Sequence, residues 1–265
     1  MTADDDRMPS AIDVTVPSSA RMYDYALGGK DHYAIDRETA DRIFAAFPAL
    51  RELVAANRGF LQRAVRFLAE QGVRQFVDLG AGIPTSPNVH EIAREVHPDA
   101  RVVYVDHDPI VAAHSRALRA DGKAVTVIEA DIRQPDLVLA ALEDKDVIDF
   151  DEPVGILFID VLHFVTDDED PAGIVARFRD RFAPGSHLVL SIACRDGVDP
   201  ESADKVTAAY QNATTPLIPR TREQIEPLFD GFELVPPGLV NMACWRADGP
   251  EIPGGLAGVA RTPTE

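Results

Sequence analysis

The chain has 265 residues, of which 46% are hydrophobic and 26% are charged, a composition typical of a folded globular protein rather than a disordered one. Its 44 Asp and Glu against 26 Lys and Arg give a formal net charge of -18. This charge argues against nucleic acid or an anionic membrane surface as a partner, because basic surfaces bind both. We expect a neutral or cationic small-molecule partner instead.

The cysteines and the N-terminus bear on the cellular compartment. Cys194 and Cys244 are too few for a disulfide framework and have no zinc-ligand spacing, so we expect no metal site. The first residues are acidic, unlike a secretory signal, and the longest apolar stretch, 155–165, is interrupted by Asp160 and His163. We therefore expect a cytoplasmic protein without membrane association, as a monomer or homodimer.

Composition divides the chain into four parts. Residues 1–17 are polar and contain Pro and Asp, which predicts a disordered N-terminus, and the Gly- and Pro-rich residues 247–265 predict a flexible C-terminal tail. Between them we expect an N-terminal helical cap or lid at 18–72 and a core at 73–246. The cap ends in an amphipathic helix, because apolar residues recur at helical spacing across 51–71.

The core alternates short apolar strands with helical stretches, which is typical of a doubly wound α/β fold with a parallel sheet. After Thr221, which forms a potential capping box with Gln224, two strands at 232–235 and 240–245 are joined by so short a turn that they must be antiparallel. The sheet is therefore mixed. The five parallel strands are expected at 75–79, 101–106, 125–130, 155–159 and 187–192.

Four dipeptides mark expected helix starts, because a capping side chain precedes proline, whose fixed φ suits the first helical turn. They are Ser86-Pro87, Asp108-Pro109, Asp170-Pro171 and Asp199-Pro200.

Ligands of such sheets bind at the carboxyl ends of the strands. The first strand is followed by Gly80 and Gly82, which permit a tight turn and close approach of a ligand to backbone N–H groups. A ligand-free turn is the alternative interpretation. Thr85 stands where the dinucleotide fingerprint has its third glycine, which disfavours a nicotinamide or flavin cofactor.

The next two strands also end in carboxylates. Asp106 can accept hydrogen bonds from both ribose hydroxyls of a nucleoside, although it could instead cap the following helix. Asp108 already fills that capping position, which favours ligand contact for Asp106. Asp131 could accept from an adenine amine while Ile132 packs on the ring.

Three stretches of the sequence resemble one family: residues 19–33, with Tyr23-Asp24-Tyr25 and Gly28-Gly29-Lys30-Asp31, residues 57–65, and residues 75–85. The chain is similar to the class I S-adenosylmethionine-dependent methyltransferases, and in particular to the S-adenosyl methyltransferase family once catalogued as a domain of unknown function. The resemblance extends from about Pro17 to Trp245. It implies a Rossmann-like, seven-stranded mixed sheet whose last strand pair is antiparallel, and S-adenosylmethionine as cofactor.

The resemblance also implies roles for individual residues. Gly80 and Gly82 would contact the methionine part of the donor, Asp106 the ribose and Asp131 the adenine, while Asp160 would face the donor or the acceptor. The full set of donor-binding residues that we expect is Asp78, Gly80, Ala81, Gly82, Asp106, His107, Asp131, Ile132, Asp160 and Tyr33.

Methyl transfer needs alignment and exclusion of water, and for some acceptors a base. Asp160 and His163 are the candidate bases, although His163 could equally be a packed core histidine. We expect the N-terminal segment to close over the donor as a lid, with Tyr23 and Tyr33 lining the acceptor pocket and the Gly28-Gly29 pair allowing closure. A helical cap that only covers sheet edges is the alternative.

The sequence thus predicts a methyltransferase that acts on a small-molecule acceptor, with His163, Asp160 and Tyr23 as catalytic candidates. The alternative from another class is a catalytically silent regulatory domain that binds S-adenosylmethionine or a related nucleoside. A dehydrogenase is the third possibility.

Overall fold

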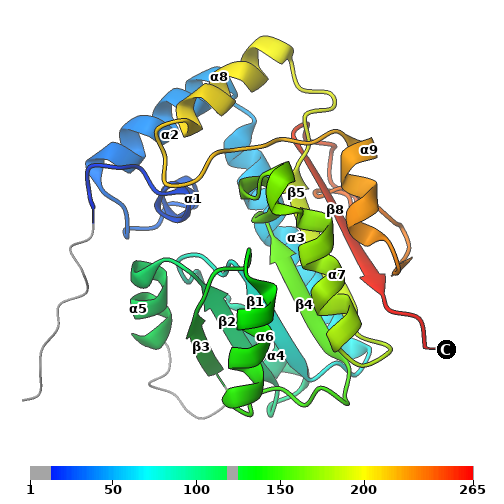
Figure 1. Cartoon of the computed structure of the whole chain (residues 1–265). Coiled ribbons are helices and arrows are strands. Elements are labelled where there is room, and N and C mark those ends of the chain that lie inside the picture. The colour runs from blue at the N-terminus through cyan, green and yellow to red at the C-terminus, as the bar shows by residue number, and fades with distance from the viewer. Residues whose placement is uncertain (1–12, 118–124, 265) are drawn as a thin grey trace, which may run out of the picture.

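The computed structural model describes residues 13–117 and 125–264. Within these ranges eight strands form one mixed sheet in the order β3-β2-β1-β4-β5-β8-β6, with β7 also paired to β8. Adjacent strands from β3 to β5 are parallel, and β8 is antiparallel to β5 (Figure 1). The strands are β1 (Gln75–Leu79), β2 (Arg101–Asp106), β3 (Val125–Glu129), β4 (Val154–Ile159), β5 (His187–Ala193), β6 (Glu233–Leu234), β7 (Val240–Asn241) and β8 (Gly255–Arg261).

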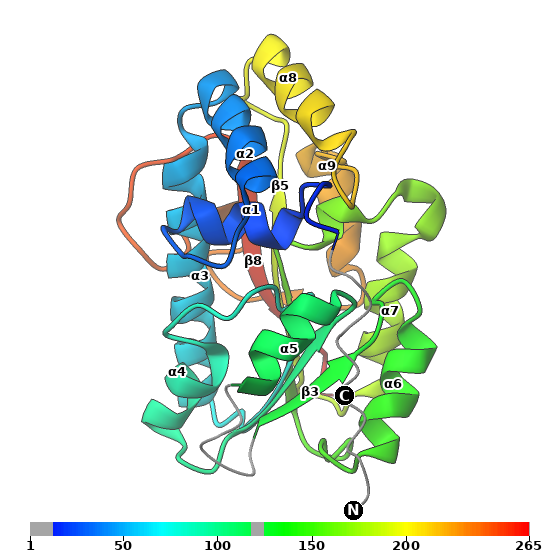
Figure 2. The same cartoon turned by 90° about the vertical axis from the view of Figure 1, so that its left-hand side faces the viewer.

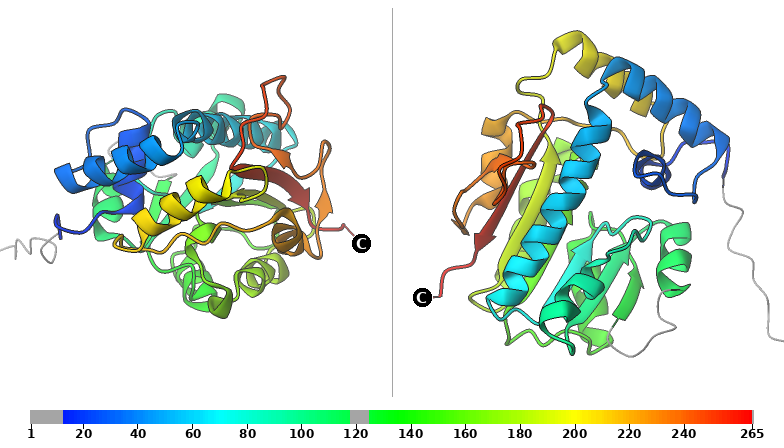
Figure 3. Two further views of the ribbon diagram at one scale, coloured as in Figure 1. Left: turned by 90° about the horizontal axis from the view of Figure 1, so that it is seen from above. Right: turned by 180° about the vertical axis from the view of Figure 1, so that it is seen from behind.

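The five parallel strands lie where the sequence predicts them, because each is an apolar run that helices cover on both faces. All residues of β1 are buried. Helices α3 (Leu50–Glu70) and α4 (Val89–Val96) pack on one face, and α6 (Pro135–Asp144) and α7 (Pro171–Arg181) on the other (Figures 1 and 3). The remaining α-helices are α1 (Ser19–Ala26), α2 (Ala34–Ala46), α5 (Pro109–Ala117), α8 (Pro200–Tyr210) and α9 (Arg222–Ile225), with short 3-10 helices η2 (Leu162–Phe164), η3 (Asp167–Glu169) and η4 (Glu226–Phe229).

The antiparallel end of the sheet differs from the prediction. β6 and β7 do not pair with each other; each pairs with β8, β6 beside Ala260 and Arg261 and β7 beside Leu256 and Ala257. The two short strands therefore share one edge position, and the sheet is seven positions wide, which confirms the seven-stranded mixed sheet but not the hairpin. The prediction also made the second strand too long, since residues beyond Asn241 form turns.

The predicted flexible tail is wrong for residues 255–261, which form β8 in the interior of the sheet. This strand contains Gly and Ala because large neighbours lie against it. A Cβ on Gly255 would lie 2.3 Å from the Met242 side chain, and one on Gly258 would lie 3.1 Å from Phe229. A strand selected for small side chains has the composition of a loop, which explains the wrong prediction.

Three of the four predicted helix starts are confirmed. α5, α7 and α8 begin at Pro109, Pro171 and Pro200, and the side chains of Asp170 and Asp199 accept hydrogen bonds from backbone N–H groups of their first turns. The Ser86-Pro87 start is wrong, because α4 begins later.

Asn88 and Glu91 form the capping box that starts α4 instead. The capping box of Thr221 and Gln224 is confirmed at the start of α9.

The N-terminal helices lie above the carboxyl ends of the parallel strands (Figures 1 and 2). α1 lies nearest to the strand ends, and α2 packs beside α8, so that an N-terminal and a later segment form one roof (Figure 3). Residues 1–12 of the predicted disordered N-terminus are outside the described residues. Residues 13–17 are described, and the Pro17 carbonyl accepts a hydrogen bond from Thr214 N–H at 3.0 Å, which corrects the prediction for this part.

Candidate functional site

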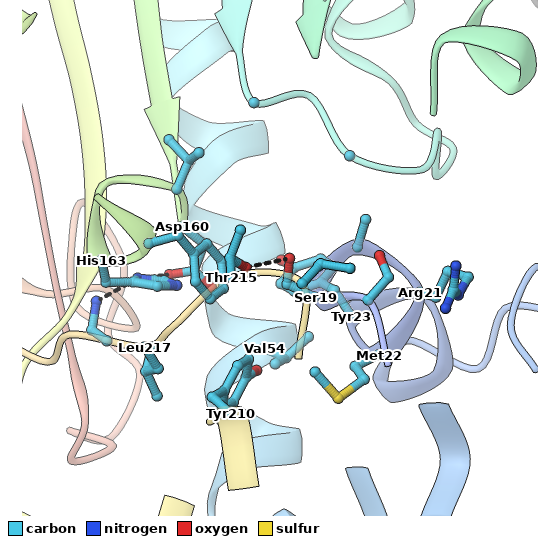
Figure 4. Close-up of a pocket in the computed structure, with 18 of the residues that line it drawn as sticks. Ser19, Arg21, Met22, Tyr23, Val54, Asp160, His163, Tyr210, Thr215 and Leu217 are labelled. Atoms are coloured by element: carbon cyan, nitrogen blue, oxygen red, sulfur yellow. Dashed lines mark hydrogen bonds and ion pairs between the residues drawn. The ribbon is translucent and has the colours of Figure 1, made fainter. Parts of the chain in front are cut away.

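A cavity of about 620 Å³ lies between the carboxyl ends of β1, β2 and β4 and the roof formed by α1, α2 and α8. Its wall contains residues that follow five different strands, as expected for a ligand site in an open sheet. Asp160, His163, Tyr23 and Tyr210 surround part of it, and the hydroxyls of Thr215 and Ser19 are hydrogen-bonded at 3.3 Å (Figure 4).

The glycine turn after β1 has the expected backbone geometry. Gly80 and Gly82 have φ angles of +75° and +63°, in the left-handed region that favours glycine. A Cβ on Gly80 would lie 2.3 Å from Val161, so this position tolerates no side chain, whereas the Cβ direction of Gly82 is open. The Val105 carbonyl accepts from the N–H groups of Gly80 and Ala81 at 2.8 and 3.1 Å, which fixes the turn beside β2.

Asp106 at the end of β2 connects two loops of the site. One carboxylate oxygen accepts from Gly82 N–H and the other from Asp108 N–H, each at 2.9 Å. Burial raises the pKa of Asp106, although these two hydrogen bonds oppose the shift. The imidazole of His107 lies 3.6 Å from the same carboxylate and is half-exposed. Both residues line the cavity.

Asp131, after β3, lines the cavity but already has a partner. Its carboxylate accepts from the Arg133 guanidinium at 2.6 Å, and Arg133 also pairs with Glu169. Burial of Asp131, which alone would raise its pKa, is outweighed by these hydrogen bonds, so the pKa is lowered and the group is a carboxylate at neutral pH. Ile132 is buried and lies in the same wall.

Asp78 lies beneath the glycine turn, and its cationic neighbour, Arg58 of α3, is not among the predicted site residues. Burial raises the pKa of Asp78 to about 7, while the charge of Arg58 opposes the shift. Arg58 donates to the carbonyls of Thr85 and Pro87, and its Nε is buried without a hydrogen-bond partner. The only sequence signal for Arg58 was its place in the 57–65 stretch.

Asp160 follows β4 in an unusual backbone conformation, with φ at +54°. Its N–H is shared between the carbonyl and the hydroxyl of Ser191, at 3.0 and 3.1 Å, which holds the residue in this conformation. Burial raises the pKa of its carboxyl to about 7. The His163 imidazole lies 3.9 Å from this carboxylate.

His163 is buried and points into the site, but its ring nitrogen Nδ1 is already used. It accepts a hydrogen bond from Ala193 N–H at 3.1 Å, so Nε2 carries the proton of the neutral ring. Burial, assisted by the nearby Arg220 charge, lowers the pKa of His163 to about 3. Arg220 itself donates to the Leu162 and Val165 carbonyls at 2.9 and 2.8 Å and so holds η2 in place.

Two tyrosines lie near Asp160. The hydroxyl of Tyr23 in α1 accepts from the Asn57 amide at 2.9 Å, and Tyr210 reaches the cavity from α8. Burial, and then the negative charge of Asp160, raises the pKa of both phenols. Tyr210 was missed, because nothing in the sequence indicates that α8 packs against α2.

Of the predicted site residues, all of which the structure describes, Tyr33 alone does not line the cavity. It precedes α2, its side chain is 41% exposed, and its ring lies 5.3 Å from the Arg21 guanidinium. The reason is that Tyr33 N–H is held by Asp36 at the start of α2, which turns the chain away from the strand ends. The prediction of donor contact for Tyr33 is therefore not supported.

Neither a metal site nor a membrane span is found in the described part of the chain. Among residues 13–117 and 125–264, no group of three or more His, Cys, Asp or Glu side chains is placed to hold a metal ion. No helix within those ranges has the length and apolarity needed to cross a membrane.

Known proteins share the sequence features and the architecture of this chain. Residues 5–263 match the model of a family described as S-adenosyl methyltransferase. A crystal structure of a DUF574 family protein from Streptomyces avermitilis is 41% identical and superimposes with a TM-score of 0.90 over 96% of this chain and 100% of that chain. A candidate methyltransferase from Thermobifida fusca is also 41% identical, with a TM-score of 0.88 over 95% of this chain and 97% of that chain.

A curated relative is more distant. The ornithine lipid N-methyltransferase of Singulisphaera acidiphila is 33% identical over 92 residues, which cover 35% of this chain and 47% of that protein. The matching region thus spans about half the length of that relative.

The order of the strands, the glycine turn after β1 and the carboxylates at the strand ends define a class I S-adenosylmethionine-dependent methyltransferase. Within that class, the chain belongs to the S-adenosyl methyltransferase family, and S-adenosylmethionine is the cofactor of this family.

Proposed function

We propose that this protein is a working methyltransferase that transfers a methyl group from S-adenosylmethionine to a small molecule bound beneath α1, α2 and α8. The observation that carries the proposal is that one cavity contains both the donor-type residues Gly82 and Asp106 and the separate group around Asp160. A methyltransferase needs two adjoining binding regions, whereas a domain that only binds the nucleoside needs one.

The donor region would hold the nucleoside at the ends of β1, β2 and β3. Asp106 keeps unused lone pairs on both oxygens after accepting from Gly82 and Asp108, so it can still accept from ribose hydroxyls. Ile132 offers an apolar surface for the adenine, with the Asp131 carboxylate beside it.

Arg58 is a further candidate for donor binding. It lines the cavity and presents a buried guanidinium nitrogen without a partner. We therefore assign it to the carboxylate of the donor's methionine part.

The part of the cavity around Asp160, His163, Tyr23 and Tyr210, which we call the acceptor region, is suited to alignment and exclusion of water. S-adenosylmethionine, when bound, supplies a methyl group on an activated sulfonium, so the protein needs mainly to hold the acceptor in line and to receive a proton where one is released. Asp160 suits the proton-accepting role because its pKa of about 7 lies near neutral pH. His163 is less suited, because Nδ1 already accepts from Ala193 N–H.

Two observations favour a small acceptor over nucleic acid. The chain carries a net charge of -18, which opposes binding of a polyanion. The Singulisphaera relative, by its name, methylates nitrogen of an ornithine lipid. A cytoplasmic monomer or homodimer remains our expectation for the location and assembly of the protein.

Donor binding is tested first, and methyl transfer is tested second. Calorimetry should show binding of S-adenosylmethionine and S-adenosylhomocysteine but not of NAD. Asp106→Asn should weaken S-adenosylhomocysteine by about tenfold or more, since the amide cannot accept from both Gly82 and Asp108 and still serve two hydroxyls. Asp146→Asn is the control, because Asp146 is exposed and lies outside the cavity wall.

Transfer of the tritiated methyl group from labelled donor into a fractionated metabolite extract then separates an enzyme from a silent binder. Label in a small-molecule fraction, lost in Asp106→Asn and kept in Asp146→Asn, supports the proposal. Tight donor binding with no labelled product in any fraction would support the regulatory domain instead.

A further inference from the structure

We propose that the methyl acceptor is an amine attached to an apolar body, with its nitrogen held by the Asp160 carboxylate among aromatic rings. This inference rests on the proposed function and names the substrate class of the same site.

The charge of Asp160 lacks a partner. No Lys or Arg nitrogen in the described part of the chain lies within 4.0 Å of its carboxylate, and the His163 imidazole at 3.9 Å is held neutral by the Ala193 N–H. The Asp160 side chain is only 20% exposed, and a carboxylate so largely removed from water is costly without a counter-ion unless a ligand provides the opposite charge. The raised pKa of Asp160 reflects that cost and would fall when an ammonium group binds.

Two arginines near the acceptor region have other partners. Arg21 pairs with the buried carboxylate of Asp36 at 2.8 Å, and Arg220, which borders the region, donates to backbone carbonyls and to Asp167. Their charges are therefore not available to an anionic acceptor. Arg195, an exposed residue, and Arg58 of the donor region also line the cavity, so the preference for a cation is local to Asp160.

Aromatic rings surround the position next to Asp160. The ring centroids of Phe164 and Tyr210 are 5.8 Å apart with planes tilted by 38°, and the His163 ring lies 4.3 Å from Phe164. Tyr23, in the roof helix α1, also lies near Asp160 (Figure 4). Faces of aromatic rings attract ammonium and methylammonium groups, so these rings would stabilise the nitrogen before and after it is methylated.

The remainder of the acceptor region would bind the body of the molecule. It lies between α1, α2, α3 and α8, and most of its wall is aliphatic or aromatic carbon. Such a wall gains affinity from an apolar group and gives none to a sugar or a free amino acid. The residues of this wall include Met22, Ile43, Phe44, Val54, Val206 and Leu217.

The chemical step is balanced without a further reactant. A bound ammonium first gives one proton to the Asp160 carboxylate, which leaves a lone pair on nitrogen. That lone pair forms the N–CH3 bond as the S–CH3 bond breaks, and the electron pair of the broken bond stays on sulfur, giving S-adenosylhomocysteine. The product nitrogen takes over the positive charge of the sulfonium, and the aromatic rings stabilise it.

The competing assignment gives Asp160 to the α-ammonium of the donor. Two observations favour the acceptor. The negative charge of Asp160 raises the pKa of Tyr210, which belongs to the roof helix α8 and not to the strand-end loops of the donor region. Asp78, a second buried carboxylate with a raised pKa, lies in the donor region beneath the glycine turn.

Matched probes test the inference by binding alone. Full-length protein saturated with S-adenosylhomocysteine is titrated in a calorimeter with phenethylamine and with phenethyl alcohol, and then with octylamine and octanol. We expect each amine to bind about tenfold or more tightly than its alcohol, because a hydrogen bond between charged groups replaces a neutral one.

The Asp160→Asn variant should abolish this preference and leave S-adenosylhomocysteine affinity unchanged. Asparagine is chosen because it tolerates the left-handed backbone of this position. Asp146→Asn makes the same substitution at an exposed position with φ at +50° and should keep the preference. Tyr210→Phe, which retains the ring, should also keep it.

The outcomes are distinct. Equal affinity of amine and alcohol in the wild type, or no binding of either, overturns the inference. So does a preference that survives in Asp160→Asn. Loss of S-adenosylhomocysteine affinity in Asp160→Asn assigns the residue to the donor and likewise overturns it. If S-adenosylhomocysteine fails to bind the wild type, the proposed function itself is wrong, and the amine inference falls with it.

Discussion

Two carboxyl groups, the buried Asp78 and the partly buried Asp160, show how individual residues of the site oppose the stability of the fold. Burial raises the pKa of each to about 7, from an ordinary value of 3.8. Residues that serve packing alone have no reason to carry this cost, and strongly shifted carboxyl groups in a cavity are typical of functional sites. The resemblance to the methyltransferase family implied a role for both positions, but not the pKa shifts, which depend on burial in the folded chain.

The shift at Asp160 predicts how stability depends on pH. Because the folded pKa exceeds the unfolded pKa, the folded protein binds more protons between pH 3.8 and about 7, and stability must fall as pH rises through that window. Asp160→Asn removes this contribution. We expect the variant to match the wild type near about pH 4 and to exceed it by about 1–4 kcal/mol near about pH 8.

Urea denaturation of ligand-free protein across this pH range measures the difference. Asp146→Asn, an exposed control in a similar backbone conformation, should show no pH-dependent gain. A gain in Asp160→Asn that is the same at both ends of the range would mean that the carboxyl is not desolvated in the folded state.

At the scale of elements, the N-terminal helices are held by one buried carboxylate. Asp36 accepts from Ser18 N–H, from Arg21 Nε and from Tyr33 N–H, at 2.9, 2.8 and 2.8 Å. It thereby joins the start of α1 to the start of α2. The sequence predicted a helical cap at 18–72 but not this anchor, since an ionic contact across a chain reversal leaves no periodic pattern.

Gly29 also has a structural role that the lid prediction did not include. A Cβ at this position would lie 1.9 Å from the Asp24 carboxylate, so the glycine permits close packing. Asp24 in turn accepts from Asp31 N–H at 2.8 Å. Whether the glycine pair also allows closure stays a prediction.

Asp36→Ala tests whether the roof opens independently of the sheet. The substitution leaves the Arg21 guanidinium buried without its partner, which costs about 3–5 kcal/mol. We expect hydrogen exchange to accelerate in α1 and α2 while β1 and β4 keep their protection, with weaker binding of an acceptor-region probe such as phenethylamine. Local opening of this kind is expected where a helix is held mainly by one ionic contact and that contact is removed.

Asp41→Ala is the matched control on the same helix. Its carboxylate is 58% exposed, lies 3.6 Å from Arg51 and accepts from the Tyr25 hydroxyl of α1 at 3.0 Å, and the cost of losing these exposed contacts should be below about 1 kcal/mol. If Asp36→Ala accelerated exchange equally in the roof and in the central strands, the roof and the sheet would form one cooperative unit, and a lid that moves alone would be excluded.

At the scale of the whole molecule, the sequence predicted the parallel half of the sheet better than the antiparallel half. β1 to β5 are apolar on both faces and bounded by turn residues, so hydrophobic pattern alone locates them. The antiparallel half depends on contacts between distant segments. β8 is composed of small residues because Phe229 and Met242 lie against it, and only the folded structure shows those neighbours.

The position of β8 makes the C-terminus essential for folding. β8 pairs with all seven residues of β5, from His187 to Ala193, and carries both β6 and β7 on its other edge. A chain that ends after Gly254 would expose the apolar edge of β5 and release both short strands. We expect it to be insoluble or to lack a cooperative thermal transition, because an unpaired apolar strand edge is prone to aggregation.

A chain that ends after Thr262 is the control. It keeps β8 and the hydrogen bond from Thr262 N–H to the Ser186 carbonyl at 2.8 Å, and removes only residues that make no strand pairs in the described structure. We expect it to unfold at the wild-type temperature and to bind S-adenosylhomocysteine normally, as followed by circular dichroism and calorimetry. Retention of a cooperative transition and of this binding by the chain that ends after Gly254 would show that β1 to β5 form a stable donor site without the antiparallel half.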